Sequence, residues 1–488
     1  MNKLLGEADI LIIGTGATGA CLARELSRYK LRIILVEKEV DVCFGTSKAN
    51  SGIVHSGIHD RPGTLKAELC VKGNRLFPYL ADELDFLYQN NESIIIARDN
   101  SELPSLEELR KNGVSNGVTG LSLLSYQQLI GLEPNLASEL TGGLLVPSGG
   151  IVAPFDLVFA MVENAVLNGV KLCLNTEVTG IDSLNKDFLV RTNRGVVKTK
   201  YLVNAAGIFS GHIARMIGDD SFSITPWKGE EFLLDSRLEG LVKRTIFPLP
   251  SKNSKGILVI PTVDGNIMIG PTAQKVRSYY DPATSSSGWE EIYCEVRKLV
   301  PSIQSKDLIT SFAGLRAISE HEDFIIGPSE INPRFFHAAG IKSPGLTSAP
   351  AIAIYLANLL KEAGLRLVPN PDFRPERRVV RLRYLSHQKQ ADLISVDSTY
   401  GNIICRCEMV SEKEVRDAIR RGATTLDGVK LRTRTGMGRC QGGFCTPKLI
   451  QIIGDELGIP PESVTKNGPG SNLLIGRLRE ENGGNSHE

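Results

Sequence analysis

Residues 9–19 read DILIIGTGATG, and this stretch decides how the first part of the chain folds. Asp9–Ile13 predicts a buried strand, Ala17–Tyr29 a helix, and Leu31–Val36 a second apolar strand. The loop that leads into the helix has the pattern G-x-G-x-x-G, which is typical of dinucleotide-binding βαβ units. The opening of the chain therefore predicts an α/β fold that begins with such a unit.

The three glycines of that loop each have a separate physical task. Gly14 allows a tight turn, Gly16 lets the backbone approach a pyrophosphate, and Gly19 lets the helix pack closely on the strand. The first N–H groups of the helix attract phosphate. Glu37 ends the second strand, 23 residues after Gly14, and can accept hydrogen bonds from ribose hydroxyls. The pattern does not separate FAD from NAD, and it also fits a Gly-rich turn beside a surface glutamate.

Length, charge and hydropathy limit the class of protein. At 488 residues the chain exceeds what one hydrophobic core usually supports, so two or three domains are expected. The net charge of +1 gives no long-range attraction for nucleic acid. No run of about 18 apolar residues occurs, so no membrane-spanning helix is expected.

The use of cysteine bears on the compartment. The chain has nine cysteines and no secretory signal, which favours a reducing, cytoplasmic location, with any membrane association made through a partner. Five cysteines are scattered singly and are expected to be small buried apolar side chains: Cys21, Cys43, Cys70, Cys173 and Cys294.

Periodicity and turn residues predict the other elements. In chain order they are an irregular loop over 41–63, helical patterns over 80–145 interrupted by a strand at Ser93–Ala97, a helix over 156–168, strands near Val170–Leu174 and Asp187–Thr192, an antiparallel sheet over 222–275, and a helix over Ala349–Glu362. After these, the basic run Arg374–Arg383 is expected to be a solvated connector. The polar residues Arg477–Glu488 are expected to be disordered.

Several further segments resemble the FAD-dependent 2-hydroxyacid and glycerol-3-phosphate dehydrogenases, in that family's order. Gly45–Ile58 is similar to the family's flavin-contacting segment, and Pro62–Ala67 is close to the L-2-hydroxyglutarate dehydrogenase branch. The other matching segments are Val203–Gly207, Phe312–Arg316, Asp323–Ile326 and Ala339–Thr347. Ordered motifs are far more specific than any single one, and these lie within roughly residues 8–365.

The resemblance implies FAD as cofactor and an α/β (α+β overall) architecture. It combines a Rossmann-like FAD-binding domain of the glutathione-reductase type with a substrate domain on an antiparallel sheet. The implied divisions are an oxidoreductase over 1–368, with FAD-binding parts 1–80, 150–215 and 310–368 and substrate parts 81–149 and 216–309, then a linker over 369–395, a small helical domain over 396–467 and a tail over 468–488.

The resemblance also implies which residues surround the cofactor. The helix after Ser348 would direct its positive end at the flavin and favour negative charge on the reduced ring, although a plain helix-start loop has the same composition. The implied FAD-binding residues are Gly14, Gly16, Ala17, Thr18, Gly19, Glu37, Lys38, Thr46, Ser47, Ser51, Gly52, His55, Val178, Ala206, Gly207, Gly314, Arg316, Gly340, Ile341, Ser343, Gly345, Leu346 and Thr347.

Three residues are candidates for catalysis. Oxidation of a secondary alcohol needs a base near neutrality, and His55 is preferred to His59, although either could simply hydrogen-bond to backbone or cofactor. Arg316 matches the family's substrate-side arginine, whose planar fork suits a carboxylate or phosphate. Lys342 stands where the glycerol-3-phosphate enzymes place a lysine, and an exposed surface lysine is the alternative.

The remaining four cysteines form two close pairs, Cys405/Cys407 and Cys440/Cys445, joined by a helix-like stretch over Ser411–Arg421. Zinc and a [2Fe-2S] cluster both accept four thiolates, but zinc sites prefer two residues between paired cysteines, whereas the gaps here are one and four. The segment Arg432–Gly442 resembles the C-terminal module of the large subunit of anaerobic glycerol-3-phosphate dehydrogenase. That module is similar to bacterioferritin-associated ferredoxin, which implies a [2Fe-2S] cluster.

These observations predict a flavoprotein dehydrogenase. Hydride would pass from a small anionic 2-hydroxy compound to FAD, and electrons would leave through the cluster to a partner subunit, either an NAD-linked flavoprotein or a quinone-side protein. Glycerol 3-phosphate is the first expected substrate and L-2-hydroxyglutarate the second. An amino-acid dehydrogenase and a non-catalytic electron-transfer protein are the alternatives.

Overall fold

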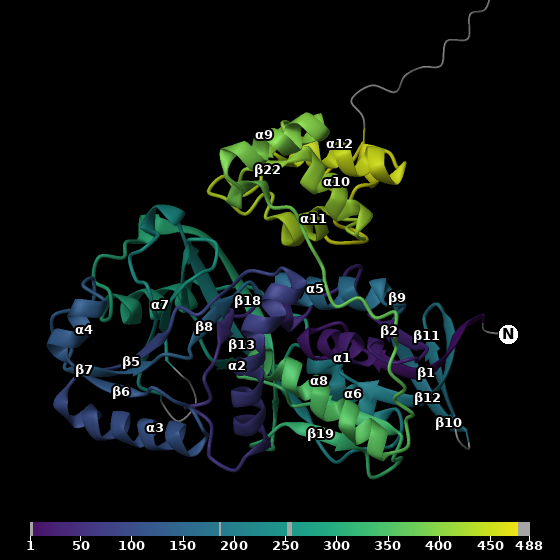
Figure 1. Ribbon diagram of the computed structural model, residues 1–488, viewed down its shortest axis with the longest axis horizontal. Coiled ribbons are helices and arrows are strands. Elements are labelled where there is room, and N and C mark those ends of the chain that lie inside the picture. Colours follow the sequence, from purple (N-terminus) through teal and green to yellow (C-terminus); the bar gives the residue numbers. More distant parts are fainter. Residues whose placement is uncertain (1–2, 185–186, 251–255, 477–488) are drawn as a thin grey trace, which may run out of the picture. The chain divides into compact units, whose positions relative to one another are not determined.

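The computed structural model describes residues 3–184, 187–250 and 256–476, so the expected disorder of Arg477–Glu488 lies outside the described residues. The chain forms two compact units, Met1–Arg378 and Val379–Glu488 (Figure 1). Each unit has hydrophobic clusters of its own. Among the described helices, none combines the length and the apolar character that crossing a bilayer requires.

A largely parallel sheet forms one half of the first unit. Its parallel strands follow the order β20-β12-β1-β2-β9, so the first strand of the chain lies in the middle. β11 pairs antiparallel with β12, β10 pairs antiparallel with β11, and β19 pairs antiparallel with β20. The strands are β1 (Leu4–Ile13), β2 (Ile33–Val36), β9 (Lys171–Cys173), β10 (Val178–Leu184), β11 (Asp187–Thr192), β12 (Gly195–Asn204), β19 (Ile325–Pro328) and β20 (Phe335–Ala339).

A group of helices packs beside this sheet. α1 (Ala17–Ser27) contacts both α5 (Pro154–Leu167) and α8 (Gly345–Glu362), and α2 (Leu65–Leu84) contacts α8 (Figure 1). The short α6 (Ser210–Arg215) follows β12. α1 can approach its neighbours closely because its inner face consists of small and aliphatic residues, of which Ala20, Leu22 and Ala23 are fully buried.

A second, mainly antiparallel sheet forms the other half. Its strands follow the order β17-β13-β16-β15-β14-β5-β7-β6, and β18 pairs with β13. The β14–β5 pair is parallel. The elements are β5 (Ser93–Ala97), β6 (Ser122–Ser125), β7 (Gly142–Val146), β13 (Ile224–Leu234), β14 (Thr245–Pro248), β15 (Leu258–Pro261), β16 (Ile267–Gly270), β17 (Gln274–Lys275) and β18 (Leu308–Ser319), with helices α3 (Leu103–Ser115), α4 (Tyr126–Leu132) and α7 (Ser286–Arg297).

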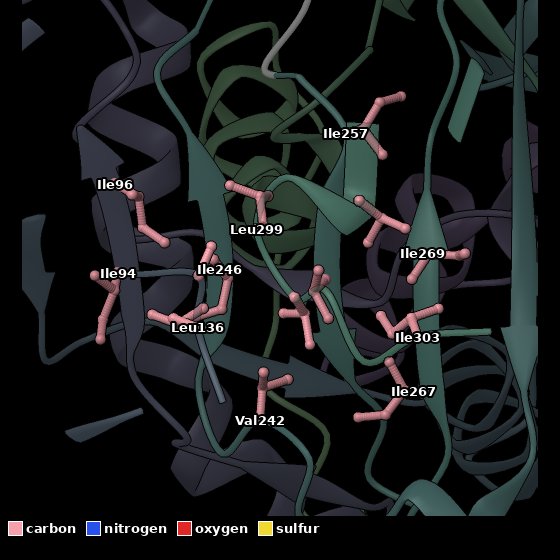
Figure 2. Packing of buried hydrophobic residues seen from close by; sticks show 14 of the residues in the cluster. Ile94, Ile96, Leu136, Val242, Ile246, Ile257, Ile267, Ile269, Leu299 and Ile303 are labelled. Atoms are coloured by element: carbon pink, nitrogen blue, oxygen red, sulfur yellow. The ribbon is translucent and has the colours of Figure 1, made fainter. Parts of the chain in front are cut away.

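Aliphatic side chains hold this second sheet together. Figure 2 shows Ile94, Ile246 and Ile269 from three of its strands gathered with Leu299 and Ile303 from the segment after α7. All five are almost completely buried. Burying such side chains is the main favourable term in folding, and it fixes the sheet in place. A small third sheet, made of β3 (Ile53–Val54), β8 (Gly150–Val152) and β4 (Tyr88–Gln89), also belongs to this unit.

The second unit is small and mainly helical. It contains α9 (His387–Val396), α10 (Glu412–Arg420), α11 (Leu426–Thr433) and α12 (Thr446–Leu457), with a two-stranded ribbon of β21 (Ile403–Cys405) and β22 (Val410–Ser411). The predicted helix over 411–421 is confirmed as α10. Its start is fixed by a capping box, in which Ser411 and Glu414 bond to each other's backbone N–H groups.

Several expectations differ from the structure. α8 begins at Gly345, directly after Pro344, and this is four residues earlier than predicted. The region 80–145 holds more strands than expected. β7 pairs with β5 on one side and with β6 on the other, and this pairing, rather than a local sequence pattern, stabilises β6 and β7. Cys294 is exposed and Cys173 is only half-buried, in contrast to the buried apolar role expected for both.

The basic run is also not a simple solvated connector. The guanidinium of Arg377 pairs with Glu163 on α5 at 2.7 Å and donates to the carbonyl of Leu84 at 3.1 Å, and its side chain is 8% exposed. This part of the run is therefore packed on the first unit. α9 likewise begins inside the stretch that was expected to be linker, 369–395, and ends one residue beyond it.

A glycine at the crossing of α2 and α8 supports one prediction. A Cβ atom on Gly73 would lie 2.0 Å from the carbonyl oxygen of Thr347. We expect Gly73→Ala to destabilise the first unit by about 1–3 kcal/mol through overpacking, even though alanine is the better helix former by about 1 kcal/mol. Thermal unfolding measures the effect. Gly131→Ala on α4 is the control, because a Cβ there meets nothing within 4 Å; equal melting temperatures for the two variants would contradict the prediction.

Candidate functional site

Four of the predicted cofactor residues lie at one edge of the parallel sheet. Gly14 directly follows β1, Glu37 follows β2, Ala206 lies two residues beyond β12, and Gly340 follows β20. Because the carboxyl ends of parallel strands lie at the same edge, four segments far apart in sequence meet there. This edge is where open α/β sheets bind their ligands.

The turn after β1 has the geometry that its glycines predict. Gly14 has φ +103°, and a Cβ atom on it would lie 2.5 Å from the carbonyl oxygen of Ala205. A Cβ on Gly19 would lie 2.0 Å from the carbonyl oxygen of Gly14. The N–H of Ala17 donates to the Oγ of Ser47 at 2.9 Å, so a second predicted segment lies at the start of α1. Thr18 is in the first turn of α1.

The end of β2 carries the acidic residue of the motif. One carboxylate oxygen of Glu37 accepts hydrogen bonds from the N–H of Thr15 at 2.9 Å and from its hydroxyl at 2.6 Å. The backbone of Glu37 also accepts from Thr176, two residues before Val178, the buried first residue of β10. Lys38 lies 4.0 Å from the ring centre of Phe209, which belongs to the turn containing Gly207.

The loop over residues 45–52 joins the two halves of the unit. Thr46 donates its hydroxyl to the carbonyl of Leu315 on β18 at 2.6 Å. A Cβ atom on Gly314 would lie 2.0 Å from the carbonyl oxygen of Ala49, so this glycine permits the backbones to touch. Gly52 has φ +64° and faces the carbonyl of Val152 in the same way. The loop is therefore held by both its ends.

His55 lies close to both the start of α8 and β14 of the second sheet. Its N–H donates to Thr347 Oγ1 at 2.8 Å, and its Nε2 is 3.1 Å from the hydroxyl of Ser343. Its ring lies 6.1 Å from the ring of Phe247, which comes from β14 of the second sheet. His59 is also close to Phe247, at 5.4 Å. The structure thus brings His55 together with the turn before α8, which contains Gly340, Ile341 and Ser343, and with the first turn of α8, which contains Gly345 and Leu346.

Arg316 lies on β18 with a half-buried side chain. Its Nη1 donates to the carbonyl of Thr272 at 3.1 Å. Its guanidinium covers Gly229, where a Cβ atom would be 2.2 Å from Nη2. Burial lowers the pKa of Arg316, and the nearby carboxylate of Glu231 opposes that shift. An arginine so fixed presents a directed positive charge at the join of the two sheets.

Sequence reasoning missed Glu231. Its side chain is almost completely buried, and its carboxylate accepts a hydrogen bond from the hydroxyl of Ser51 at 2.8 Å. Burial raises its pKa to about 7, against the hydrogen bond from Ser51 and the charge of Arg316. The available signal was the alternation of side chains along β13. It places Glu231 on the same face of the sheet as Trp227, which is opposite Arg316.

Lys342 differs from a fully exposed surface lysine. It is half-buried, and its pKa is lowered by burial and by the charge of Lys66, with Asp60 and Glu322 opposing. Lys66 itself pairs with Asp60 at 3.5 Å. Lys342 therefore belongs to a group of charged residues at the start of α2, directly next in sequence to the Ser343 that bonds to His55.

The four cysteines of the second unit lie as two pairs. The Sγ atoms of Cys407 and Cys440 are 3.7 Å apart, and Cys405 and Cys445 are hydrogen-bonded to each other. Two sulfurs on one tetrahedral metal with bonds of about 2.3 Å are about 3.8 Å apart, so the measured pair fits one metal atom. In the part of the chain that the structure describes, no three Cys, His, Asp or Glu side chains gather as a site for a single ion. A two-iron cluster needs two sulfurs at each iron.

Hydrogen bonds and close packing of the loops determine the properties of this cysteine site. The N–H groups of Gly442, Phe444 and Gly443 lower the pKa of Cys440 against the effect of burial. The pKa of Cys405 is lowered to about 6, mainly by a hydrogen bond from Cys445. A Cβ on Gly438 would lie 2.3 Å from that of Cys407, so the loops touch here.

A buried carboxylate ties the cysteine loops together. Glu408 lies between the first two cysteines and β22, and accepts from Arg383 at 2.6 Å and from Arg434 at 2.7 Å. Both arginines therefore hold the first cysteine loop in place, one from the start of the unit and one from the residues before the second loop. Such support around a metal site orients the ligands.

Comparison with protein families agrees with this division into two sites. Residues 9–359 match the family model described as FAD dependent oxidoreductase. Residues 403–455 match the model described as BFD-like [2Fe-2S] binding domain, and this range contains all four cysteines.

Curated proteins and solved structures include close relatives. A glycerol 3-phosphate dehydrogenase of Caloramator mitchellensis is 41% identical over 97% of this chain and 99% of its own length. A glycerol 3-phosphate oxidase of Mycoplasma genitalium is 34% identical over 74% of this chain and 97% of its own. Among structures, the FAD-bound L-alpha-glycerophosphate oxidase of Mycoplasma pneumoniae matches 77% of this chain and 99% of its own, with a TM-score of 0.74 and 31% identity.

The contact between Gly314 and the 45–52 loop supports a second prediction. We expect Gly314→Ala to push the loop from β18 and to weaken FAD binding about 5- to 150-fold, which lowers the FAD content of the purified protein, because displacement by a methyl group costs about 1–3 kcal/mol. Absorbance per protein measures the flavin content. Gly211→Ala is the matched control, since a Cβ there meets nothing nearer than 3.5 Å; normal flavin in Gly314→Ala would show that the contact is not needed.

Proposed function

Since the chain belongs to the FAD dependent oxidoreductase family and carries a BFD-like [2Fe-2S] binding domain, we propose that it is a glycerol 3-phosphate dehydrogenase that delivers electrons through its cluster to a partner protein. The observation that carries the proposal is the 41% identity to a glycerol 3-phosphate dehydrogenase over 97% of this chain, both units included. The oxidase relative matches 74% of the chain, so about a quarter of this chain has no counterpart in it.

The residues at the join of the two sheets suit this substrate. FAD, when bound, supplies the hydride acceptor. The Nε2 of His55 lies 3.1 Å from the hydroxyl of Ser343, and it can accept the proton of the substrate hydroxyl when that hydroxyl replaces Ser343 at this nitrogen. Arg316 supplies a fixed positive charge for the anionic end, and Lys342 adds a second cation. Two cations favour a doubly charged phosphate over a single carboxylate.

The four cysteines are the proposed cluster ligands. Cys405 and Cys445 would hold one iron on the buried side, and Cys407 and Cys440 the other iron nearer the surface. The cluster, when bound, carries single electrons. Free thiols at this site require a reducing compartment, and we therefore place the protein in the cytoplasm.

The surface beside the outer cysteine pair supports a protein partner. Phe444 is 86% exposed and Met409 is 46% exposed, and Arg406 and Arg439 are also exposed beside the outer cysteines. Exposed apolar side chains with positive charges at a redox centre are typical of a surface that docks an acidic partner. We propose that the electron acceptor, either a flavoprotein or a quinone-linked protein, binds here.

L-2-hydroxyglutarate is the second candidate substrate. The segment Pro62–Ala67 is close to that branch, and an L-2-hydroxyglutarate dehydrogenase of Bos taurus is 29% identical over 72% of this chain. This substrate also carries two negative charges, so the cations alone do not separate the candidates.

Anaerobic mixing of the FAD-loaded, cluster-loaded protein with each compound tests the function. We expect glycerol 3-phosphate to bleach the flavin absorbance and L-2-hydroxyglutarate to bleach it at least about 100-fold more slowly at equal concentration, since a misplaced charge or missing contact costs about 3 kcal/mol. Proline tests the amino-acid alternative. Faster bleaching by either of the other compounds would overturn the assignment of substrate, and no bleaching by any of the three would favour an electron relay.

Charge reversal at the cluster surface tests the partner proposal. In Arg406→Glu/Arg439→Glu, reduction of the trianion ferricyanide should slow about tenfold and reduction of the trication hexaammineruthenium(III) should accelerate, because steering by charge changes sign. Iron content and flavin bleaching serve as controls for an intact protein. With both oxidants, the rates of the double variant should converge with those of the wild type at about 1 M salt, where the screening length is about 3 Å. Equal rates at low salt would remove this surface from the electron path.

A further inference from the structure

The position of Glu231 follows from the register of β13 and β18. Trp227 is opposite Arg316, Gly229 is opposite Gly314, and Glu231 is opposite Phe312. Because side chains alternate along a strand, these residues share one face of the sheet. The glycine pair leaves that face open between Arg316 and Glu231. The guanidinium fills this opening, since its Nη2 lies 2.2 Å from where a Cβ of Gly229 would be.

The carboxyl group of Glu231 is poorly satisfied as an anion. Its side chain is 3% exposed, and one oxygen accepts a hydrogen bond from Ser51 at 2.8 Å. The other oxygen is buried and accepts no hydrogen bond from the residues that the structure describes. A buried carboxylate with an unsatisfied oxygen carries a large desolvation cost, which protonation removes.

We propose that Glu231 is a positioning residue whose protonation state sets how strongly Arg316 attracts the anionic substrate. This inference rests on the proposed function. When Glu231 holds a proton, the positive charge of Arg316 is available to the substrate. When Glu231 is ionised, it forms an internal counter-charge for the arginine and competes with the substrate anion.

The groups around Glu231 define the pH range of this effect. Arg316 faces it from β18 and the hydroxyl of Ser51 faces it from the loop, and both favour the ionised form. Burial outweighs them and raises the pKa to about 7. Glu230 lies next in the strand on the opposite face, where Ser285 donates to it and Lys228 lies 3.7 Å away. Substrate affinity should therefore fall as the pH rises through neutrality.

The same carboxyl group also affects stability in a way that does not involve the substrate. Its pKa is raised from 4.5 in the unfolded chain to about 7 in the folded one. The folded state then binds more protons than the unfolded state between these two values, so the contribution of Glu231 to stability falls as the pH rises across that range. Glutamine has no such titration, so Glu231→Gln should gain stability relative to the wild type above neutrality.

Rapid anaerobic mixing of glycerol 3-phosphate with the holoenzyme tests the inference. Flavin bleaching gives the substrate Kd and the limiting rate between about pH 5.5 and pH 8.5. Dividing the wild-type Kd by that of Glu231→Gln removes the titration of the substrate itself. If only the protonated form attracts substrate, this ratio should rise about twofold at pH 7 and about tenfold at pH 8 relative to pH 5.5, with the ratio of limiting rates unchanged.

Two controls keep the outcomes separate. Glu231→Asp retains a titrating carboxyl and should restore the pH dependence of Kd, and the melting temperature of Glu231→Gln minus that of the wild type should increase from about pH 5 to pH 8. A Kd ratio that is flat with pH, in an enzyme that bleaches normally, would overturn the role of Glu231. A wild-type holoenzyme that glycerol 3-phosphate does not bleach would instead overturn the proposed function, while the melting difference still reports whether Glu231 titrates.

Discussion

The contact between the 45–52 loop and β18 is the constraint on which the first unit depends. The carbonyl oxygen of Ala49 lies where a side chain of Gly314 would begin, and Thr46 hydrogen-bonds to the next residue of the strand. This joins the parallel sheet, whose edge carries the dinucleotide-binding turn, to the antiparallel sheet, which carries Arg316. A side chain at this point would push the loop from the strand, at the place where the two sheets bring their functional groups together.

That join also explains why polar and ionisable groups are buried there. Ser51, Glu231 and Arg316 come from both sides of the contact, and the packing that holds the sheets together buries Glu231 almost completely and Ser51 and Arg316 partly. Burial makes every charge interaction stronger than it would be in water. A site of this kind can fix the orientation of an anionic substrate, and it makes the site sensitive to the proton on a single carboxyl group.

The second unit also uses buried packing to hold its functional groups, the four cysteines, in place. Its chain is short, and its core is made of aliphatic side chains from α10, α11 and α12 together with the buried cysteines Cys405 and Cys445. Glu408, held by two arginines, fixes the first cysteine loop. The inner pair of sulfurs is therefore part of the core, while the outer pair lies near solvent, which gives the site a protected side and an accessible side.

Local sequence was sufficient for the features that depend on neighbouring residues. The βαβ unit, the glycine turn, the capped helix α10 and the two close cysteine pairs all follow from periodicity, backbone freedom and spacing within a few residues. The strands β6 and β7 and the true start of α8 were less accessible, because pairing and packing with distant segments decide them.

The sequence by itself determined the elements that depend on neighbouring residues and the chemical groups that the chain offers: a dinucleotide-binding turn, a histidine and an arginine in family motifs, and four clustered thiols. Only the tertiary structure decided which of these residues act together. Glu231 became visible because the register of β13 against β18 places it beside Arg316, 85 residues later in the chain, and because burial changes its proton affinity. Both effects depend on distant segments that exclude water jointly, and no local pattern encodes that.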